Sequence, residues 1–210
     1  MARILHLVAS PRGDLSYSRR AAEAFLEGYL IENPNDMVEC IPLHDGSLPA
    51  FGALCVHGKY KIMSGQEQSP EESQAWQEVK KTIEHLKSAD KLVISSPMWN
   101  FGLPYVLKQY LDIIIQPGLT FSFSSDTGYK GSITGKPAML FLARGSDYSE
   151  ESGLSGLDHQ KPYLELALGF IGFTEITTIL IEPTMQKGQS VAEAKLNEAI
   201  EKAKSKIGRF

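Results

Sequence analysis

The sequence predicts an α/β fold, a doubly wound, five-stranded parallel sheet of order 2-1-3-4-5 with helices on both faces. Short apolar runs, typical of strands buried on both faces, alternate along the chain with longer segments of helical periodicity. Such alternation implies parallel pairing through right-handed crossovers, and five strands joined in this way most simply give that order. A length of 210 residues suits a single domain spanning residues 1–210.

The five expected strands are short, nearly continuous apolar runs. They lie at residues 3–9, 37–41, 91–95, 138–143 and 175–181. Helical periodicity occupies the intervals between strands and the end of the chain. The expected helices lie at residues 18–31, 71–88, 103–115, 157–171 and 191–207.

Two segments break the regular alternation. Residues 42–69 are long, polar and rich in glycine and proline, so we expect a surface excursion near an active site or a partner. In residues 120–135, Phe121 and Phe123 alternate with serine before a turn-forming sequence. This pattern predicts a small hairpin or loop lid ahead of the fourth strand.

Composition excludes some classes of partner. Hydrophobic residues make up 42% of the chain and charged residues 22%, which is ordinary for a globular protein. The formal net charge of −4 offers no general electrostatic attraction for nucleic acid, whose phosphates require clustered lysine and arginine. We therefore expect no nucleic-acid partner.

The chain carries no signal for secretion or membrane insertion. The N-terminus passes directly into a strand pattern, and apolar runs such as residues 111–115 are far shorter than the ~20 residues that span a bilayer. Cys40 and Cys55 lack metal-type spacing, and the scattered histidines form no HExxH motif. We expect a cytoplasmic protein with no bound metal and no membrane partner.

The loop after the first strand is rich in hydroxyl groups. Ligands of open parallel sheets bind beyond the carboxyl ends of the strands, where residues 10–19 lie. Ser10, Ser16 and Ser18 supply hydroxyl donors beside Tyr17, and the start of the following helix attracts anions. The loop predicts a phosphate cradle, although it lacks GxGxxG and GxxxxGK[ST]. The alternative is that Ser18 merely caps the helix and Ser16 merely turns the chain.

The loop after the third strand carries a more specific motif. Residues 97–104 read Pro-Met-Trp-Asn-Phe-Gly-Leu-Pro. This stretch resembles the FMN-dependent NADH:quinone oxidoreductases and azoreductases of the flavodoxin-like superfamily. Their loop along the isoalloxazine ring has a Pro-Met-Tyr-Asn-Phe type motif, in which Trp99 here replaces the tyrosine. The resemblance continues through residues 117–121, 131–136 and 164–173, and so covers nearly the whole chain.

The resemblance implies a flavodoxin-like fold that binds FMN. The chemistry of the residues agrees, because an isoalloxazine needs flat apolar contacts for its faces and amide partners for its polar edge. Asn100 and the backbone of residues 98–101 can supply both kinds of contact. The alternative is an ordinary strand-to-helix turn, in which Trp99 and Phe101 are core anchors and Asn100 caps a helix.

The loop after the fourth strand completes the resemblance only in part. Family members carry Ser-Arg-Gly-Gly followed shortly by a histidine, and Arg144 and Gly145 match this pattern. Ser146 stands in place of the second glycine, and Tyr148 stands about where the histidine is expected. The histidine's role in proton transfer therefore does not carry over. Tyr148 can donate through its hydroxyl, or can simply pack against the lid.

The three loops together define the predicted site. No side chain is assigned a catalytic role outright, and the candidates are Asn100 and Tyr148. The expected cofactor contacts are Ser10, Ser16, Tyr17, Ser18, Met98, Trp99, Asn100, Phe101, Ala143, Arg144, Gly145 and Ser146.

The function that the resemblance implies is a two-electron oxidoreductase. NADH or NADPH donates to the flavin, and a quinone, or an azo compound as a second class of acceptor, then takes two electrons in a ping-pong cycle. FAD is the alternative cofactor, used by longer relatives, but little chain remains after the last helix to bind an adenosine. The alternative functions are a flavodoxin-like electron-transfer protein and a regulatory flavin-binding protein, neither turning over a substrate.

Family members are homodimers with the flavin at the subunit boundary, so we also expect a homodimer. Tyr105, Tyr110 and residues 113–115 form an apolar stripe that is compatible with an interface. The alternative is that this stripe packs on the sheet of its own chain.

Overall fold

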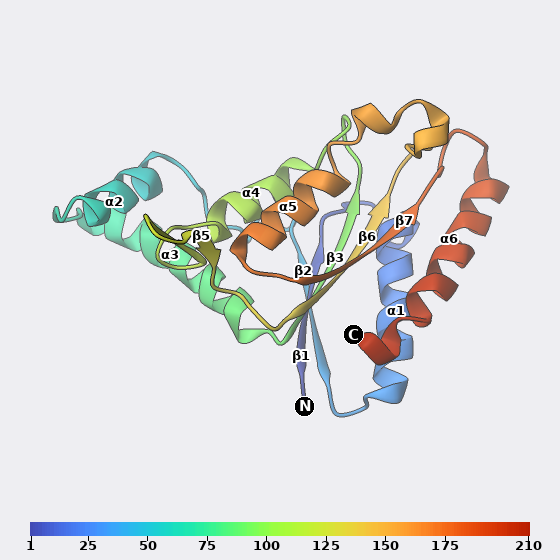
Figure 1. Cartoon of the computed structure of the whole chain (residues 1–210), viewed down its shortest axis with the longest axis horizontal. Helices are drawn as coiled ribbons and strands as arrows, with labels where there is room; N and C mark the ends of the chain where they lie inside the picture. The colour runs from blue at the N-terminus through green and yellow to red at the C-terminus, as the bar shows by residue number, and fades with distance from the viewer.

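The computed structural model describes all of residues 1–210, which fold into a parallel sheet between two layers of helices (Figure 1). The sheet has five strands in the order β2-β1-β3-β6-β7, and all four pairings are parallel. This confirms the predicted order 2-1-3-4-5. The strands are β1 (Arg3–Val8), β2 (Met37–Pro42), β3 (Lys91–Pro97), β6 (Pro137–Ala143) and β7 (Glu175–Ile181).

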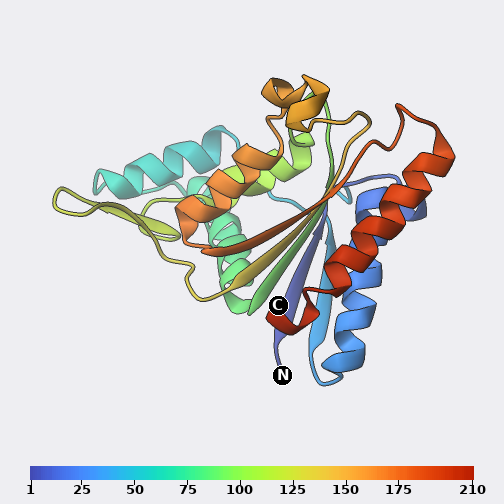
Figure 2. The same cartoon turned by 45° about the vertical axis from the view of Figure 1, so that its right-hand side comes forward.

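Helices cover both faces of the sheet, as Figure 2 shows. The first and last α-helices pack together over one face, and three central helices cover the other. The α-helices are α1 (Tyr17–Glu32), α2 (Ala53–Met63), α3 (Pro70–Ser88), α4 (Tyr105–Ile114), α5 (Lys161–Ile171) and α6 (Gln189–Lys204). Short 3-10 turns lie at Gly13–Leu15, Glu150–Ser152, Ser155–Leu157 and Ile207–Arg209.

Two apolar cores explain why the strands read as continuous apolar runs. In β6, Leu140 and Leu142 face the core beneath α3, α4 and α5, whereas Met139 and Phe141 face the core beneath α1 and α6. Successive side chains of a strand point to opposite faces, so a strand covered on both sides has no polar positions to alternate. The apolar run is therefore the expected signature of this sheet.

The segment between β2 and α3 contains a helix that the sequence pattern did not reveal. Residues 42–69 were expected to form an excursion, yet α2 lies within them and packs on α3. Of its residues only Cys55 and Gly58 are buried, so the helix has no apolar stripe of the usual width. Gly58 permits the contact, since a Cβ at this position would lie 3.0 Å from the carbonyl oxygen of Glu72.

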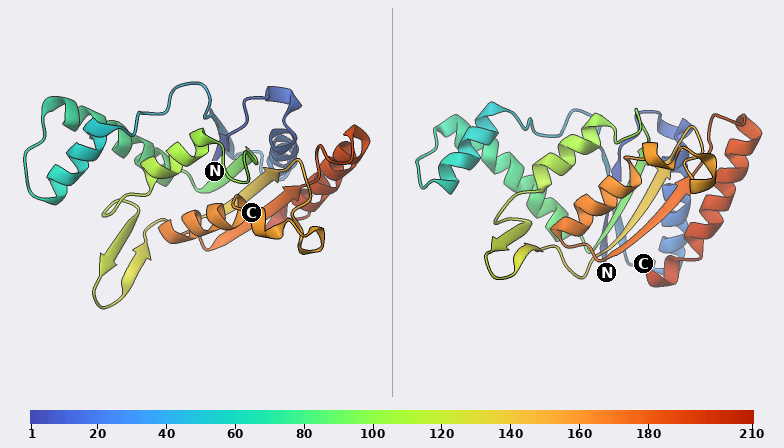
Figure 3. Two further views of the ribbon diagram at one scale, coloured as in Figure 1. Left: turned by 90° about the horizontal axis from the view of Figure 1, so that it is seen from above. Right: turned by 45° about the horizontal axis from the view of Figure 1, so that its top comes forward.

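The predicted hairpin is present as β4 (Phe121–Ser124) paired antiparallel with β5 (Gly128–Gly131). Both it and α2 project from the same end of the molecule, as Figure 3 shows. The apolar stripe of α4 belongs to the core: Tyr110 is 3% exposed and Ile113 is fully buried, while only Tyr105 is largely exposed. Of the two possibilities for this stripe, the structure shows the second, in which it packs on the sheet of its own chain.

Candidate active site

The carboxyl ends of four strands surround a cavity of about 260 Å³. Loops after β1, β3, β6 and β7 contribute its walls, because the carboxyl ends of parallel strands meet at one edge of the sheet. The cavity is lined by Ser10, Arg12, Ser16, Tyr17, Ser18, Pro97, Met98, Trp99, Ala143, Gly145, Thr184 and Met185.

Hydroxyl groups and a helix start form one end of this cavity. The Ser16 hydroxyl accepts a hydrogen bond from the Arg19 amide at 3.3 Å, so Ser16 is the N-cap of α1. Ser18 is fully buried in the first turn, with its hydroxyl oxygen 3.2 Å from that of Ser16. Because Ser16 is the N-cap, the alternative that Ser18 merely caps the helix is wrong. Hydroxyl donors at a helix N-terminus, with the exposed Arg12 nearby, suit a phosphate group.

The turn after β3 forms another part of the cavity wall. Trp99 and Gly102 exchange both backbone hydrogen bonds, at 3.0 and 2.9 Å, which leaves Asn100 and Phe101 with φ of 47° and 68°. Side-chain-bearing residues rarely adopt this left-handed region, and they cluster at functional sites when they do. Asn100 is not a helix cap, since the N-cap of α4 is Pro104. Trp99 and Phe101 are 37% and 47% exposed, so neither is a core anchor.

Three aromatic rings extend this wall beyond the cavity. The Trp99 ring lies 5.6 Å from that of His44 and 6.3 Å from that of Tyr105, measured between centroids. The rings of His44 and Tyr105 meet edge to face at 5.7 Å. Such a cluster holds an aromatic surface in a defined position beside the cavity, where a planar ligand can stack.

Some residues of the loop after β6 line the cavity, and others point into the protein interior. Ala143 and Gly145 line the cavity, and a Cβ on Gly145 would lie in ordinary contact with Met185, 3.4 Å from its sulfur. Arg144 instead points into the protein, where its guanidinium contacts two carboxylates. The ring of Tyr148 lies 5.8 Å from that guanidinium carbon and is not part of the cavity wall.

The structure brings together most of the residues expected from the sequence. Ser10, Ser16, Tyr17, Ser18, Met98, Trp99, Ala143 and Gly145 line the cavity. Asn100, Phe101, Arg144 and Ser146 lie in the same loops but outside the lining. For Asn100, Phe101 and Ser146, direct contact with a cofactor stays a prediction, whereas the side chain of Arg144 points away from the cavity.

Four lining residues were not anticipated: Arg12, Pro97, Thr184 and Met185. Arg12 and Pro97 lie in two of the predicted site loops. Thr184 and Met185 follow β7, the fifth strand of the sheet. Because the carboxyl ends of all parallel strands meet at one edge, the strand order by itself indicates that the loop after β7 also reaches this site.

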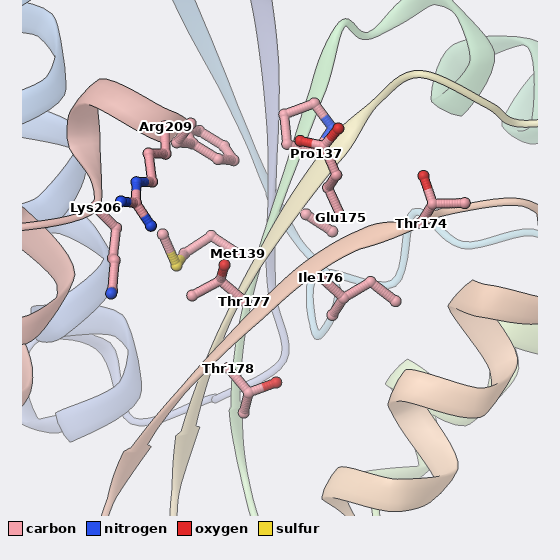
Figure 4. A pocket seen from close by; sticks show the side chains of 11 residues that line it. Pro137, Met139, Thr174, Glu175, Ile176, Thr177, Thr178, Lys206 and Arg209 are labelled. Atoms are coloured by element: carbon pink, nitrogen blue, oxygen red, sulfur yellow. The ribbon is translucent and has the colours of Figure 1, made fainter.

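A second opening lies at the opposite end of the sheet. It has a volume of about 520 Å³ and wraps the open edge of β7, with Met139, Lys206 and Arg209 on one side of the strand and Ile176 and Thr178 on the other (Figure 4). None of the expected site residues reaches it. We therefore place the functional site at the carboxyl edge, where loops from different strands converge.

The cavity at the carboxyl edge fits FMN in its chemistry. Its lining includes hydroxyl groups at the start of α1 as well as Met98, the indole of Trp99 and the small residues Ala143 and Gly145. A ligand with an anionic phosphate and a flat ring system matches these two kinds of contact. No helix of the structure is both long and apolar enough to cross a membrane.

Comparison with known proteins agrees with this geometry. A family model described as the flavodoxin-like fold matches residues 2–207. The chain is 47% identical over 204 residues to the FMN-dependent NADH:quinone oxidoreductase of Nitratidesulfovibrio vulgaris strain DP4, with 97% of each chain covered. It is 43% identical over 208 residues to the protein of the same name from Desulfotalea psychrophila strain LSv54, again with 97% of each covered.

Solved structures give the same picture. An azoreductase from Bacillus anthracis strain Sterne superposes with a TM-score of 0.91 at 31% identity, over the whole of both chains. An FMN-dependent NADH-azoreductase from Bacillus anthracis strain Ames Ancestor, solved in complex with FMN, superposes with a TM-score of 0.85 at 26% identity, covering 98% of this chain and 99% of that one. The chain therefore belongs to the flavodoxin-like family of FMN-dependent NADH:quinone oxidoreductases.

Proposed function

We propose that this protein is an FMN-dependent oxidoreductase that passes two electrons from NADH or NADPH to quinones, with azo compounds as a second class of acceptor. The observation that carries this proposal is that one cavity is lined both by the serine hydroxyls at the start of α1 and by the indole of Trp99. FMN supplies the hydride chemistry when bound. The protein supplies binding, orientation and the exclusion of competing reactions.

The residues divide this work by position. Ser10, Ser16 and Ser18 bind the phosphate, together with the first amides of α1. Met98, Trp99, Asn100 and Phe101, with Tyr17, Ala143, Gly145 and Ser146, surround the rest of the cofactor. Asn100 and Tyr148 are the candidates for a polar contact with the reacting groups, through an amide and a hydroxyl.

The first test of this function is cofactor identification followed by steady-state kinetics. We expect purified protein to bind about one FMN per chain, with released cofactor distinguishing FMN from FAD. Oxidation of NADH by a simple quinone should give parallel double-reciprocal lines. The reason is that one cavity must release the nicotinamide before the acceptor can enter it. Intersecting lines would contradict the shared cavity, and FMN binding without turnover would favour the electron-transfer or regulatory alternative.

We expect Ser18→Ala to weaken FMN binding by about 1 to 2 kcal/mol, because a buried hydroxyl that donates to a phosphate is lost. Riboflavin lacks the phosphate, so its affinity should change little. Fluorescence titration of both ligands measures the difference. Ser16→Ala is the matched comparison, since it also removes the N-cap of α1 and should lower the free energy of unfolding by about 1 kcal/mol. Equal weakening of both ligands by Ser18→Ala would rule out a phosphate contact.

We propose a homodimer that uses the surface formed by α2, the β4–β5 hairpin and α5. Large apolar side chains are exposed there, among them Met63 (62%), Phe123 (64%), Tyr129 (65%) and Leu166 (69%). Exposed apolar groups gathered on one surface are typical of protein interfaces. The helix α2 and the hairpin lie on the left in Figures 1 and 3, and α5 packs against β5.

We expect Leu166→Glu to raise the dimer dissociation constant roughly tenfold or more, because a charge would be buried in an apolar contact. Light scattering across a concentration series measures the mass. Met37→Glu is the control, because Met37 is also exposed, at 54%, but lies on β2, away from these elements. A monomeric wild-type protein, or equal effects of the two variants, would remove this surface from consideration.

A cytoplasmic location and a single FMN-binding domain over residues 1–210 complete the proposal. Cys40 and Cys55 are both free, which suits a reducing compartment. Fractionation of cells that express the protein tests the location.

A further inference from the structure

Arg144 is an arginine held wholly inside the protein. Only 1% of its side chain is exposed, and its guanidinium donates to three acceptors. The Nη2 atom lies 2.7 Å from Asp158 Oδ2, Nη1 lies 3.3 Å from Glu182 Oε2, and Nε lies 3.2 Å from Gln160 Oε1. The planar fork of a guanidinium suits such a set of acceptors, whereas a single ammonium group does not reproduce it.

On one side, this network reaches the turn that follows β3. The second carboxylate oxygen of Asp158 accepts the amide of Gln160 at 3.0 Å, which orders the segment that leads into α5. The residue between them, His159, donates its amide to the carbonyl of Phe101 at 2.9 Å. Arg144 is thus connected through Asp158 to the backbone of the left-handed turn.

On the other side, the network joins the loops that follow β6 and β7. The carboxylate oxygen of Glu182 that accepts from Arg144 also accepts the amide of Tyr148 at 3.2 Å. The carbonyl of Arg144 accepts both the amide and the hydroxyl of Thr184, at 2.8 and 2.9 Å. Thr184 lines the cavity, so Arg144 also holds a second part of the cavity wall in place.

We propose that Arg144 is a positioning residue for the flavin cavity, which joins the turn at residues 99–102 to the loops after β6 and β7 without touching the cofactor. The inference rests on the proposed function. Backbone in the left-handed region persists only when its surroundings determine it, and the Arg144–Asp158 pair stabilises the segment that holds Phe101. A cavity wall must keep its position to within about 0.5 Å for efficient chemistry.

The test uses Arg144→Lys and Asp158→Asn in the full-length protein. Both variants keep side chains of similar length. We expect each to raise the dissociation constant of riboflavin, which reports on contacts with the ring, about tenfold. At saturating FMN, reduction by NADH should slow by roughly tenfold to a hundredfold, because small displacements of a cavity wall have effects of this size. The visible absorption band of the bound flavin should shift in both variants.

The double variant separates positioning from direct contact. If Arg144 acts through Asp158, both substitutions disturb the same interaction. The riboflavin affinity and the reduction rate of the double variant should then equal those of the more impaired single variant. If the effects of the two substitutions on riboflavin affinity and reduction rate multiply in the double variant, Arg144 contacts the flavin directly and the proposal is wrong. Where Arg144→Lys fails to fold, Asp158→Asn tests the same pathway, because its own effect on riboflavin affinity and reduction rate is predicted.

A matched control is Arg3→Lys, since Arg3 pairs with Glu39 at the opposite end of the sheet. It should leave flavin affinity and reduction rate unchanged. If Arg144→Lys and Asp158→Asn lower only the melting temperature, with riboflavin affinity and rate as in the wild type, the role is purely structural and the proposal is wrong. A wild-type protein that binds no FMN would contradict the proposed function instead, which keeps the two failures distinguishable.

Discussion

We expect Gly131→Ala to lower the free energy of unfolding by about 3 kcal/mol, the upper end of the usual range for overpacking, because the neighbouring backbone atoms cannot move aside. Gly131 ends β5, where the hairpin crosses the end of α5 with backbone against backbone. A Cβ would lie 2.3 Å from both the Gly172 nitrogen and the Ile171 carbonyl carbon. These atoms belong to the end of α5, which is held by the hydrogen bond from the Ile133 amide to the Ile171 carbonyl at 2.8 Å.

Urea and thermal unfolding of Gly131→Ala measure this effect. A loss of this size corresponds to a fall in melting temperature of about 6 to 12 °C for a protein of this length. Gly169→Ala is the matched control, because Gly169 lies in α5 itself and a Cβ there would meet nothing within 4 Å. It should leave stability unchanged or raise it by about 1 kcal/mol through helix propensity. Similar stabilities for the two variants would show that the hairpin can move away from α5.

We expect the protein to lose about 2 kcal/mol of stability between pH 7.5 and pH 5, and about 3 kcal/mol by pH 4, through His6 alone. His6 is 1% exposed, and burial followed by the nearby charge of Arg19 lowers its pKa from 6.5 to about 4. The unfolded chain therefore takes up a proton as the pH falls through 6.5, whereas the folded protein does not until about pH 4. The contribution is complete above pH 6.5 and is lost on acidification.

The free energy of unfolding, measured by urea titration at several pH values, tests this expectation. His6→Gln keeps a group able to bond the Ser95 hydroxyl, which lies 3.0 Å from His6 Nε2, but does not titrate. Its stability should change less than that of the wild type between pH 7.5 and pH 5. His57→Gln is the control, because His57 is exposed on α2 and its replacement should keep the wild-type slope. Parallel curves for the wild type and His6→Gln would assign the acid sensitivity to other groups.

The start of α3 could be predicted from neighbouring residues alone. The sequence predicts that this helix begins at residue 71, and in the structure it begins at Pro70. The Ser69 hydroxyl accepts the Glu72 amide at 3.2 Å, and the Glu72 carboxylate accepts the Ser69 amide at 2.7 Å. This capping box is a short-range device, so its position in the sequence is its position in the structure.

The start of α5 depended on a distant residue. Periodicity suggested residue 157, whereas the helix begins at Lys161. Asp158 accepts the amides of Gln160 and Lys161, and its other oxygen is engaged by Arg144 from the end of β6. Because an ion pair between residues 14 positions apart defines the helix entry, no local pattern indicates it.

The sequence by itself determined the strand order and the edge of the sheet where the site lies, because apolar runs that alternate with helical periodicity allow few parallel arrangements. It also placed Ser16, Ser18 and Trp99 in the loops that now line one cavity. Only the tertiary structure decided which loop residues face that cavity. Arg144 turns inward because two carboxylates, one from the segment after β7 and one from the segment before α5, offset the cost of burying its charge. Because Arg144, Asp158 and Glu182 come together only in the folded protein, no periodic pattern in the sequence indicates their contact.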